Sequence, residues 1–370
     1  MDTGKRGFLV AGLGVGVGLA ATAARAQDTR AGGADAARPA ATDRLHYNFA
    51  GSGRQTTMVD VNYRPRRVNK AIELWEDGHA VNYTGYTPTG RGEGYEMGRA
   101  MAKTWCDAVY YEGEHGVFDI ANLQNFVRGL VDGGPTRSGH RTPMIYVSLP
   151  VTGVDEASMR ANSWVLQQVL ATGVHGIDLC HARDPRAIET AVAAMRYPFD
   201  YPGVPKQRLE GLRGDGSEAF AAQVWGVTRG RYMHIADLWP LNPRGEIVLG
   251  TKIEDRHAHA NVDRTLAVPG VCFAEWGPGD STMSVVGLSA YPDETPPRAD
   301  ARASHPLDSR LDAARLKVLA ACKAHHIKPV NMSRNHDPIV AFREGDEFMG
   351  VKDEQAVLAL REYTRRTMPI

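Results

Sequence analysis

Cysteine is scarce in this sequence of 370 residues, which contains only Cys106, Cys180, Cys272 and Cys322. So few cysteines exclude a disulfide-based scaffold for a chain of this length. Each lies in or beside an apolar run, so we expect buried free thiols.

An excess of charge of one sign is also lacking, because 43 basic residues balance 43 acidic ones. This balance, without runs of like charge, argues against a nucleic-acid-binding protein.

Long apolar segments are lacking too, except near the N-terminus. Lys5 and Arg6 precede an apolar stretch from Phe8 to Ala24, and the small residues Ala24 and Ala26 follow the pattern of a cleavage site. Residues 1–26 are therefore predicted to be an export signal, which implies a periplasmic or secreted protein with no stable membrane insertion after cleavage. An uncleaved membrane anchor is the less favoured alternative, because the stretch is short and rich in Gly and Ala.

The start of this signal resembles the twin-arginine export motif, with Lys5 in place of the first arginine. The general secretory route remains the alternative. Residues 27–67 are mostly small, polar and aperiodic, and they predict a flexible leader.

The rest of the chain, residues 68–370, alternates apolar runs of strand length with helix-like segments. The strand candidates are 80–85, 107–115, 143–150, 176–182, 247–254, 270–277, 328–333 and 347–353. Asp119 and Asp184 stand where helices should begin, and Gly133 and Gly173 where helices should end. Eight strands alternating with helices predict a single α/β domain, a (β/α)8 TIM barrel, in preference to an open doubly wound sheet. A Gly-x-Gly-x-x-Gly motif after the first strand is also lacking, which argues against a dinucleotide-binding fold.

Two acidic residues stand at equivalent ends of neighbouring strand candidates. Glu254 closes the fifth run, and Asp280 follows the turn Gly277-Pro278-Gly279 after the sixth. Because TIM-barrel chemistry occurs at the carboxyl ends of the strands, the two carboxylates should converge and would repel without a cation. Mg²⁺ or Mn²⁺ suits such a site, keeps positions for substrate oxygens and can stabilise the enolate of a 2-oxo acid. The alternative is that both acids are helix caps or rim residues.

A second candidate cluster follows the second strand directly, where the sequence reads Glu112-Gly113-Glu114-His115. A histidine oriented by a carboxylate suits proton transfer near neutral pH. Taken alone, the same residues also fit a surface turn.

Together, several motifs in a fixed order resemble a known family. They are EGEHGVFD, SLP, MRYP, RGDGSE, KIE, WGPGDS and HPLD. This order, over about residues 68–355, resembles the metal-dependent HpcH/HpaI aldolase/citrate lyase family, in particular its class II 2-oxo-acid aldolases. Glu-x-His after the second strand and the pairing of Ile-Glu with Gly-Pro-x-Asp are the most specific parts.

The resemblance implies a TIM barrel that assembles into homo-oligomers, usually hexamers. It also implies a divalent-metal-dependent carbon–carbon lyase that cleaves or forms 4-hydroxy-2-oxo acids through a pyruvate enolate, with an oxo acid and an aldehyde as its small-molecule partners. By this resemblance Glu254 and Asp280 are the metal ligands. His115 is the acid/base, and Glu112 is its orienting partner, where the family usually has aspartate.

The same resemblance implies substrate-binding residues. Backbone at Gly277 and Gly279 would contact the substrate carboxylate, and Arg213 in the RGDGSE motif is a further candidate contact. Ser148, after the third strand, is included because it replaces part of the family's substrate-binding Val-Arg-Pro motif.

Two further departures from the family change the charge of the site. The arginine of Val-Arg-Pro is Leu149 here, and the glutamine of Gln-x-Glu is Lys252. Residues two apart in a strand share a face, so Lys252 should face the barrel mouth beside Glu254 and partly replace the lost charge. A lysine is a point charge without the guanidinium fork, so the bound substrate would lie differently. There are two alternatives. Lys252 could be a Schiff-base nucleophile, or an ion pair between Lys252 and Glu254 could damage the metal site.

Other features leave alternatives open. His181, after the fourth strand, could reach the mouth, whereas His257 and His259 point apart on a helix and cannot share an ion. The proline-rich segment 289–306 fits a lid, a subunit contact or a plain surface loop. The function could also be that of an exported, non-catalytic barrel that binds oxo acids, or of a related lyase acting on a different acid such as an acyl thioester.

Overall fold

The computed structural model describes residues 59–293 and 308–370. The predicted export signal, most of the predicted leader and the proline-rich segment from residue 294 onward lie outside the described residues. Among the helices of the described ranges, none combines the length and the apolar character that a membrane span requires.

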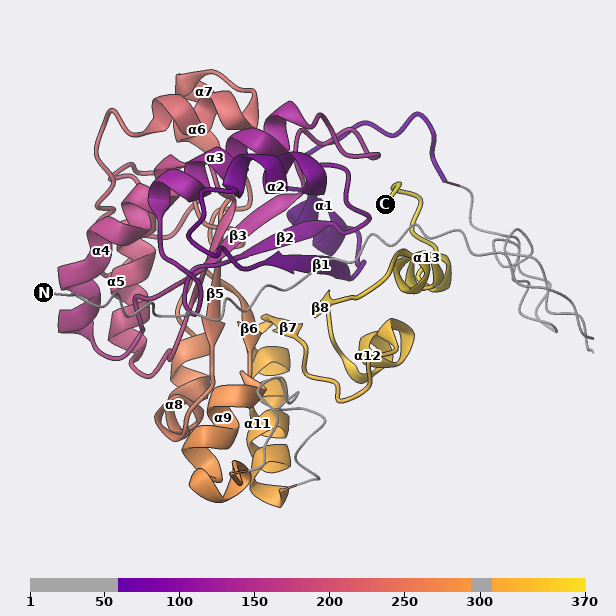
Figure 1. Ribbon diagram of the computed structural model, residues 1–370. Coiled ribbons are helices and arrows are strands. Elements are labelled where there is room, and N and C mark those ends of the chain that lie inside the picture. Colours follow the sequence, from indigo (N-terminus) through magenta and orange to yellow (C-terminus); the bar gives the residue numbers. More distant parts are fainter. Residues whose placement is uncertain (1–58, 294–307) are drawn as a thin grey trace, which may run out of the picture. The chain divides into compact units, whose positions relative to one another are not determined.

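Within the described residues, parallel strands pair in sequence order and close into an eight-stranded barrel (Figure 1). The strands are β1 (Val81–Tyr86), β2 (Ala108–Glu112), β3 (Met144–Leu149), β4 (Gly176–Leu179), β5 (Val248–Lys252), β6 (Val271–Glu275), β7 (Lys328–Val330) and β8 (Phe348–Gly350). Val81 pairs with Phe348 where β1 and β8 close the barrel. The predicted (β/α)8 barrel is confirmed, and each strand overlaps the run predicted for it.

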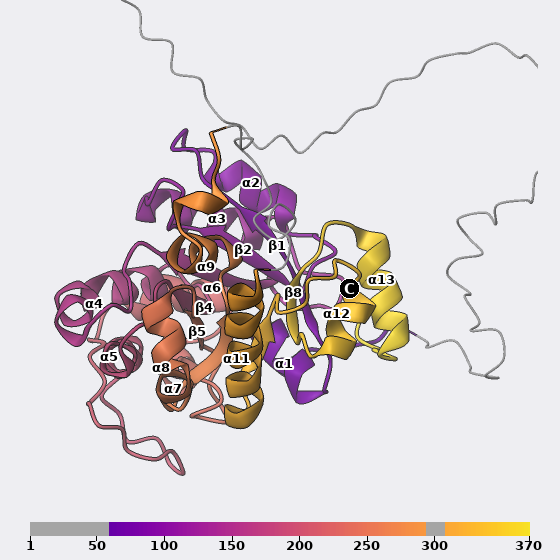
Figure 2. The same ribbon diagram turned by 90° about the horizontal axis from the view of Figure 1, so that it is seen from below.

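Helices connect the strands, and α12 and α13 lie on the β8 side of the barrel in both views (Figures 1 and 2). The helical elements are α1 (Lys70–Glu76), α2 (Gly94–Met101), α3 (Ile120–Asp132), α4 (Glu156–Ala171), α5 (Pro185–Met195), α6 (Glu218–Trp225), α7 (Arg229–Ile235), α8 (Arg256–Leu266), α9 (Pro278–Val285), η2 (Leu288–Ala290), α11 (Ser309–His325), α12 (Pro338–Glu344) and α13 (Glu354–Tyr363). Asp119 and Asp184 cap α3 and α5 as predicted, each accepting a backbone N–H of the first turn. Gly133 is the C-cap of α3, and Gly173 directly follows the C-cap of α4.

Aromatic side chains fill the barrel interior. Tyr83, Tyr146, Phe273 and Phe348 pack with ring centroids 5.1 to 5.7 Å apart. Gly250 of β5 leaves the room this requires, because a Cβ there would come within 2.0 Å of the Phe273 ring. The barrel is therefore a packed core, as expected for this fold, and the residues that follow this layer toward the carboxyl ends of the strands are polar.

The amino end of the barrel is held by a buried ion cluster. Asp107, just before β2, accepts two hydrogen bonds from the guanidinium of Arg366, at 2.6 and 2.8 Å. The ammonium of Lys70 lies 2.9 Å from the same carboxylate, and all three side chains are almost completely buried. The C-terminal tail is thus fastened beneath the first strands.

The segment before α1 also binds the barrel. The backbone N–H of Asp60 donates to the carbonyl of Thr367 at 3.0 Å, and Tyr63 donates its hydroxyl to Glu73. Residues 60–67 were assigned to the flexible leader from sequence, yet these contacts connect them to the ordered domain. All four cysteines are free and buried, as predicted.

Candidate active site at the carboxyl end of the barrel

Glu254 lies two residues after the end of β5 and is only 1% exposed. One of its oxygens, Oε1, accepts the backbone N–H of His181 at 2.8 Å. Gly277, with φ of 53°, lies against it, and a Cβ at 277 would come within 2.3 Å of the Glu254 Cβ and 2.6 Å of Oε2. Glycine favours this backbone conformation, and the lack of a Cβ allows the close approach. Burial raises the pKa of Glu254 to about 7, so a nearby cation would favour its ionised form.

Asp280 lies in the first turn of α9, directly after the Gly277 turn. His181 is near both acids: its Nδ1 is 3.9 Å from Glu254, and the charge of Asp280 contributes to raising its pKa. The largest contribution to that rise is a 2.9 Å hydrogen bond between His181 and Asp255. Arg183 in turn donates to Asp255 at 2.7 Å. The sequence predicted that His181 could reach the mouth, but it gave no sign of the Asp255 contact.

The ligand chemistry of Glu254 and Asp280 suits a hard divalent cation. Glu254 and Asp280 follow neighbouring parallel strands and supply carboxylate oxygens, which Mg²⁺ and Mn²⁺ prefer. Gly277 lies beside Oε2 of Glu254 without a side chain that would cover it. The buried carboxylate with its raised pKa is the kind of group that a bound cation stabilises.

Glu112, at the end of β2, organises the loop that carries His115. Its carboxylate accepts hydrogen bonds from Ser148 Oγ at 2.7 Å, Tyr110 Oη at 2.9 Å, and the backbone N–H groups of Glu114 and His115 at 2.8 and 3.1 Å. Burial alone would raise the pKa of Glu112, but the His115 side chain, the Ser148 hydroxyl, the charge of Lys252 and the His115 backbone N–H hold it below its usual range. The His115 imidazole is 3.8 Å from Glu112 and largely exposed. The structure thus brings the predicted pair together, with Ser148 as an anchor of Glu112.

Replacement of Ser148 by alanine should lower the free energy of unfolding by about 1.5–3 kcal/mol, because a buried carboxylate loses a hydrogen-bond donor. Urea denaturation followed by circular dichroism would measure the change. Ser163→Ala on the surface of α4, where the hydroxyl donates only to a carbonyl of its own helix, is the control and should shift stability by less than about 0.5 kcal/mol. Equal effects of the two substitutions would contradict this role of Ser148.

Lys252 is 7% exposed and forms its ion pair with Glu114, at 2.6 Å, rather than with Glu254. Burial alone would lower the pKa of Lys252, but the acidic groups around it, Cys180, Tyr110, Asp178 and Glu275, raise it above its ordinary value. An ammonium stabilised in this way is a poor nucleophile, which argues against the Schiff-base alternative. Leu149 is fully buried, so the end of β3 supplies no positive charge.

Two further acids near Lys252 were not predicted. Asp178 of β4 is 2% exposed, and its Oδ1 has no hydrogen-bond partner in the part of the chain that the structure describes. Burial holds the pKa of Asp178 far above its usual value. Glu275 of β6 is aligned with Lys252 and accepts a 3.3 Å hydrogen bond from Asn331. Both acids lie at inward positions of their strands, so strand periodicity could have found them.

Arg213 lies outside this site, which corrects its assignment as a substrate contact. Its backbone N–H donates to the carbonyl of Arg196, just after α5, so it lies at the amino end of the barrel. The guanidinium is 2% exposed, stacks on Tyr197 and donates to Tyr232 Oη at 3.0 Å. The side chain therefore stabilises the packing around α7.

The histidines of α8 have separate environments, as predicted. His259 is buried and its Nε2 lies 3.1 Å from the carbonyl of Ile253 and 3.2 Å from Ser281 Oγ. The backbone N–H of His257 donates a hydrogen bond to the carboxylate of Asp255.

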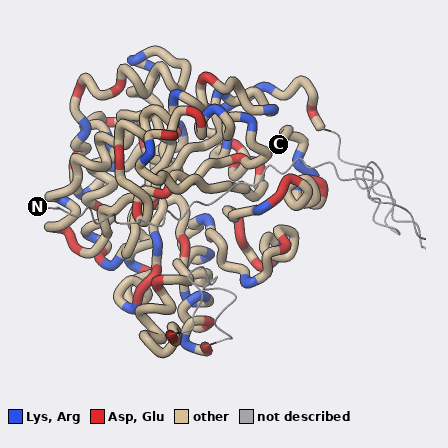
Figure 3. The backbone as a smooth tube through the Cα atoms, viewed as in Figure 1, with Lys and Arg blue, Asp and Glu red and all other residues tan. Residues whose placement is uncertain are grey.

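Lysines and arginines are interspersed with acidic residues along the backbone tube in Figure 3, so neither sign of charge dominates a segment.

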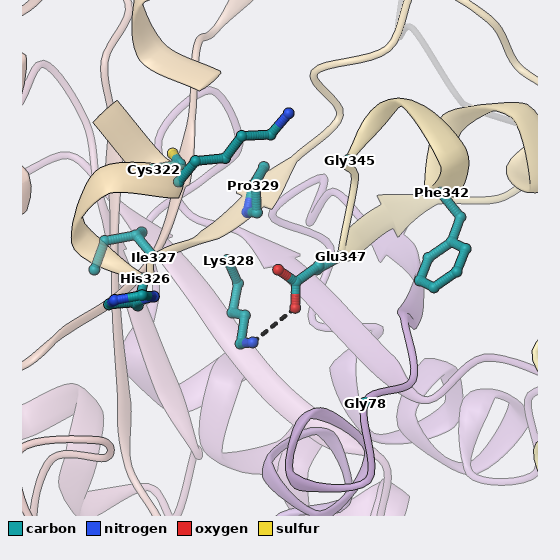
Figure 4. Close-up of a pocket in the computed structure, with 10 residues that line it drawn as sticks. Gly78, Cys322, His326, Ile327, Lys328, Pro329, Phe342, Gly345 and Glu347 are labelled. Carbon is teal, nitrogen blue, oxygen red and sulfur yellow. Dashed lines mark hydrogen bonds and ion pairs between the residues drawn. The ribbon is translucent and has the colours of Figure 1, made fainter. Parts of the chain in front are cut away.

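A cavity of about 430 Å³ lies at the other end of the barrel (Figure 4). Lys328 and Glu347, which form a 2.7 Å ion pair there, stand at the start of β7 and just before β8. The cavity also contains Lys323 and His326, from the end of α11. Lys323 in the last turn of α11 complements the dipole of that helix.

No protein-family model matches the sequence, and no curated protein is significantly similar to it. Solved structures are similar in fold. An HpcH/HpaI aldolase/citrate lyase family protein from Burkholderia cenocepacia J2315 aligns with a TM-score of 0.55 and 21% identity over 80% of this chain and 97% of that one. An HpcH/HpaI aldolase from Desulfitobacterium hafniense DCB-2 aligns with a TM-score of 0.51 and 18% identity over 79% and 92%. A citrate synthase aligns with a TM-score of 0.52 and 17% identity over 77% and 91%. The predicted resemblance is confirmed at the level of the fold.

Proposed function

We propose that this chain is a divalent-metal-dependent carbon–carbon lyase of the aldolase type, related to the HpcH/HpaI family, that acts on a 4-hydroxy-2-oxo acid. The observation that carries the proposal is the placement of Glu254 and Asp280 at the ends of β5 and β6, with Gly277 packed against Glu254. The similarity in fold to an HpcH/HpaI aldolase supports it.

Each residue at the carboxyl end of the barrel would have its own role in the reaction. Glu254 and Asp280 would hold a divalent ion, Mg²⁺ or Mn²⁺, which supplies Lewis-acid stabilisation of an enolate. His115 would take the proton of the substrate's 4-hydroxyl group, and Glu112 holds its loop in place. The C3–C4 bond would then break, the aldehyde would leave, and the electron pair of the bond would form the pyruvate enolate, which would take up at C3 the proton that His115 had accepted. Backbone N–H groups at the start of α9, beside Gly277 and Gly279, would donate to one oxygen of the acid's carboxylate and leave the other for a side chain of the mouth.

The first prediction of this proposal is exchange of the methyl protons of pyruvate in D₂O. The purified protein with Mg²⁺ or Mn²⁺ should exchange them faster than buffer, because the enolate forms and takes up deuterium at C3. Proton NMR of the methyl signal measures the rate. EDTA should remove the exchange, and Glu254→Gln should slow it by about a hundredfold or more, as expected when a metal ligand is lost.

Exchange no faster than in buffer would argue against a pyruvate-enolate enzyme. It would favour the second candidate, a barrel that binds oxo acids without converting them. One observation favours that candidate: the end of β3 has the buried Leu149 in place of a cation, and Lys252 is already paired with Glu114.

We also propose export and self-association. Support for export comes from the basic and apolar pattern of residues 1–26. Large exposed apolar side chains, Trp164 on α4, Met283 on α9 and Leu288, are compatible with subunit contacts. The balance of charges along the chain supports small-molecule partners over nucleic acid.

A further inference from the structure

The ion pair between Lys252 and Glu114 connects the end of β5 to the loop after β2. The two side chains are 8% and 13% exposed, and Nζ lies 2.6 Å from Oε2. This is the geometry in which a lysine binds a carboxylate ligand. An ammonium group has three protons to donate, and Glu114 is the acceptor for one of them.

The ammonium lies close to the candidate metal ligand Glu254, because the Glu114 carboxylate that it binds is near both. Lys252 precedes Glu254 by two residues and shares its strand face. Ligand atoms of Glu114, Cys180 and Glu254 all lie within 4.8 Å of one another. Arg183, another cation at this end of the barrel, is engaged by Asp255, and Leu149 offers no charge.

Glu114 lies in an irregular segment after β2, and its carboxylate has a second partner within reach. Residues 113–119 form no helix or strand, and Glu114 stands between Gly113 and His115. Its carboxylate is 3.5 Å from the His115 imidazole. If a ligand's carboxylate replaces the Glu114 carboxylate, the buried ammonium of Lys252 stays paired. The replacement therefore avoids the large free-energy cost of an unpaired buried charge.

We propose that Lys252 binds the carboxylate of the oxo acid, and that Glu114 occupies the ammonium group until the acid displaces it. The inference rests on the proposed function and names the residue that recognises its substrate. It also explains how a site without a cation at β3 can hold an anionic acid. Binding would free Glu114 beside His115, so that substrate recognition and the acid/base loop are linked.

The test measures the binding of oxalate, an unreactive analogue of the pyruvate enolate, and of pyruvate to the full chain with Mg²⁺ by isothermal titration calorimetry. Glu114→Gln should tighten binding by about threefold or more, because the internal competitor is lost. Lys252→Met should weaken it by about tenfold or more, the loss expected for a charged hydrogen bond. Lys252→Arg, which keeps the charge, should retain measurable binding.

Glu347→Gln is the matched control, because it breaks another lysine–glutamate pair of similar length, 2.7 Å, at the opposite end of the barrel. It should leave oxalate affinity unchanged. Unchanged affinity in folded Lys252→Met, or weaker binding in Glu114→Gln, would overturn the inference. If Lys252→Met does not fold, the Glu114→Gln result decides.

The inference and the proposed function fail in different ways. The wild-type chain could show metal-dependent exchange of pyruvate protons while substitutions of Lys252 and Glu114 leave the oxalate affinity unchanged. This result would support the proposed function and contradict the inference. Neither exchange nor oxalate binding by the wild-type chain would overturn both.

Discussion

Gly277→Ala is expected to destabilise the protein by about 2–5 kcal/mol and to abolish metal binding at Glu254. The left-handed backbone at 277, with φ of 53°, costs a non-glycine residue about 1–2 kcal/mol. The new methyl group would also lie 2.3 Å from the Glu254 Cβ, and overpacking of this kind costs about 1–3 kcal/mol. Urea denaturation measures the first effect, and titration with Mn²⁺ followed by electron paramagnetic resonance measures the second.

Gly279→Ala, two residues further on, is the control for stability. A Cβ at Gly279 has no heavy atom within 4 Å, and the residue lies in the first turn of α9. Because alanine favours helix more than glycine does, this substitution should leave stability unchanged or raise it by up to about 1 kcal/mol. Equal destabilisation by both substitutions would show that the close approach of Gly277 to Glu254 is unimportant.

Asp107→Asn should lower the free energy of unfolding by about 3–5 kcal/mol, because it leaves two buried cations, Lys70 and Arg366, without their counter-ion. Burial alone would raise the pKa of Asp107, but the two cations hold it well below its usual range. Urea denaturation at neutral pH would measure the loss. Asp200→Asn, which removes the exposed partner of Lys206, is the control and should change stability by less than about 1 kcal/mol.

The same cluster sets a dependence on pH. A carboxyl whose pKa is lowered by folding stabilises the protein above the pKa of the unfolded chain, about 3.9 for aspartate. That stabilisation is complete at neutral pH and is lost as the pH falls below this value. The difference in stability between the wild-type chain and Asp107→Asn should therefore shrink at acid pH. A constant difference down to about pH 2 would contradict the assignment.

Much of the fold follows from local sequence, because strand-length apolar runs alternate with helices that begin at aspartates such as Asp119 and Asp184. The placement of Glu254 and Asp280 follows equally directly, since both close or follow strand candidates and parallel strands end on the same side of a barrel. Periodicity within a strand also placed Lys252 toward the mouth.

Contacts between distant segments were harder to predict. Lys252 and Glu114 are 138 residues apart, and only closure of the barrel brings the second strand's loop to the fifth strand. The sequence predicted Arg213 at the substrate site, at the carboxyl end of the barrel. It lies at the amino end instead, because the chain that follows α5 continues there. The strained backbone of His181, with φ of 47°, leaves no signature in the sequence at all.

The fastening of Arg366 to Asp107 also determines when the molecule can be completed during synthesis. Translation proceeds from the N-terminus, so β1 and β2 emerge long before the residue that neutralises Asp107. Until β8 has been synthesised, β1 also lacks its partner, and its edge remains open to other chains. The barrel therefore closes only after β8 has been made, and loss of Arg366 would remove the contact that fastens the segment after α13 to Asp107.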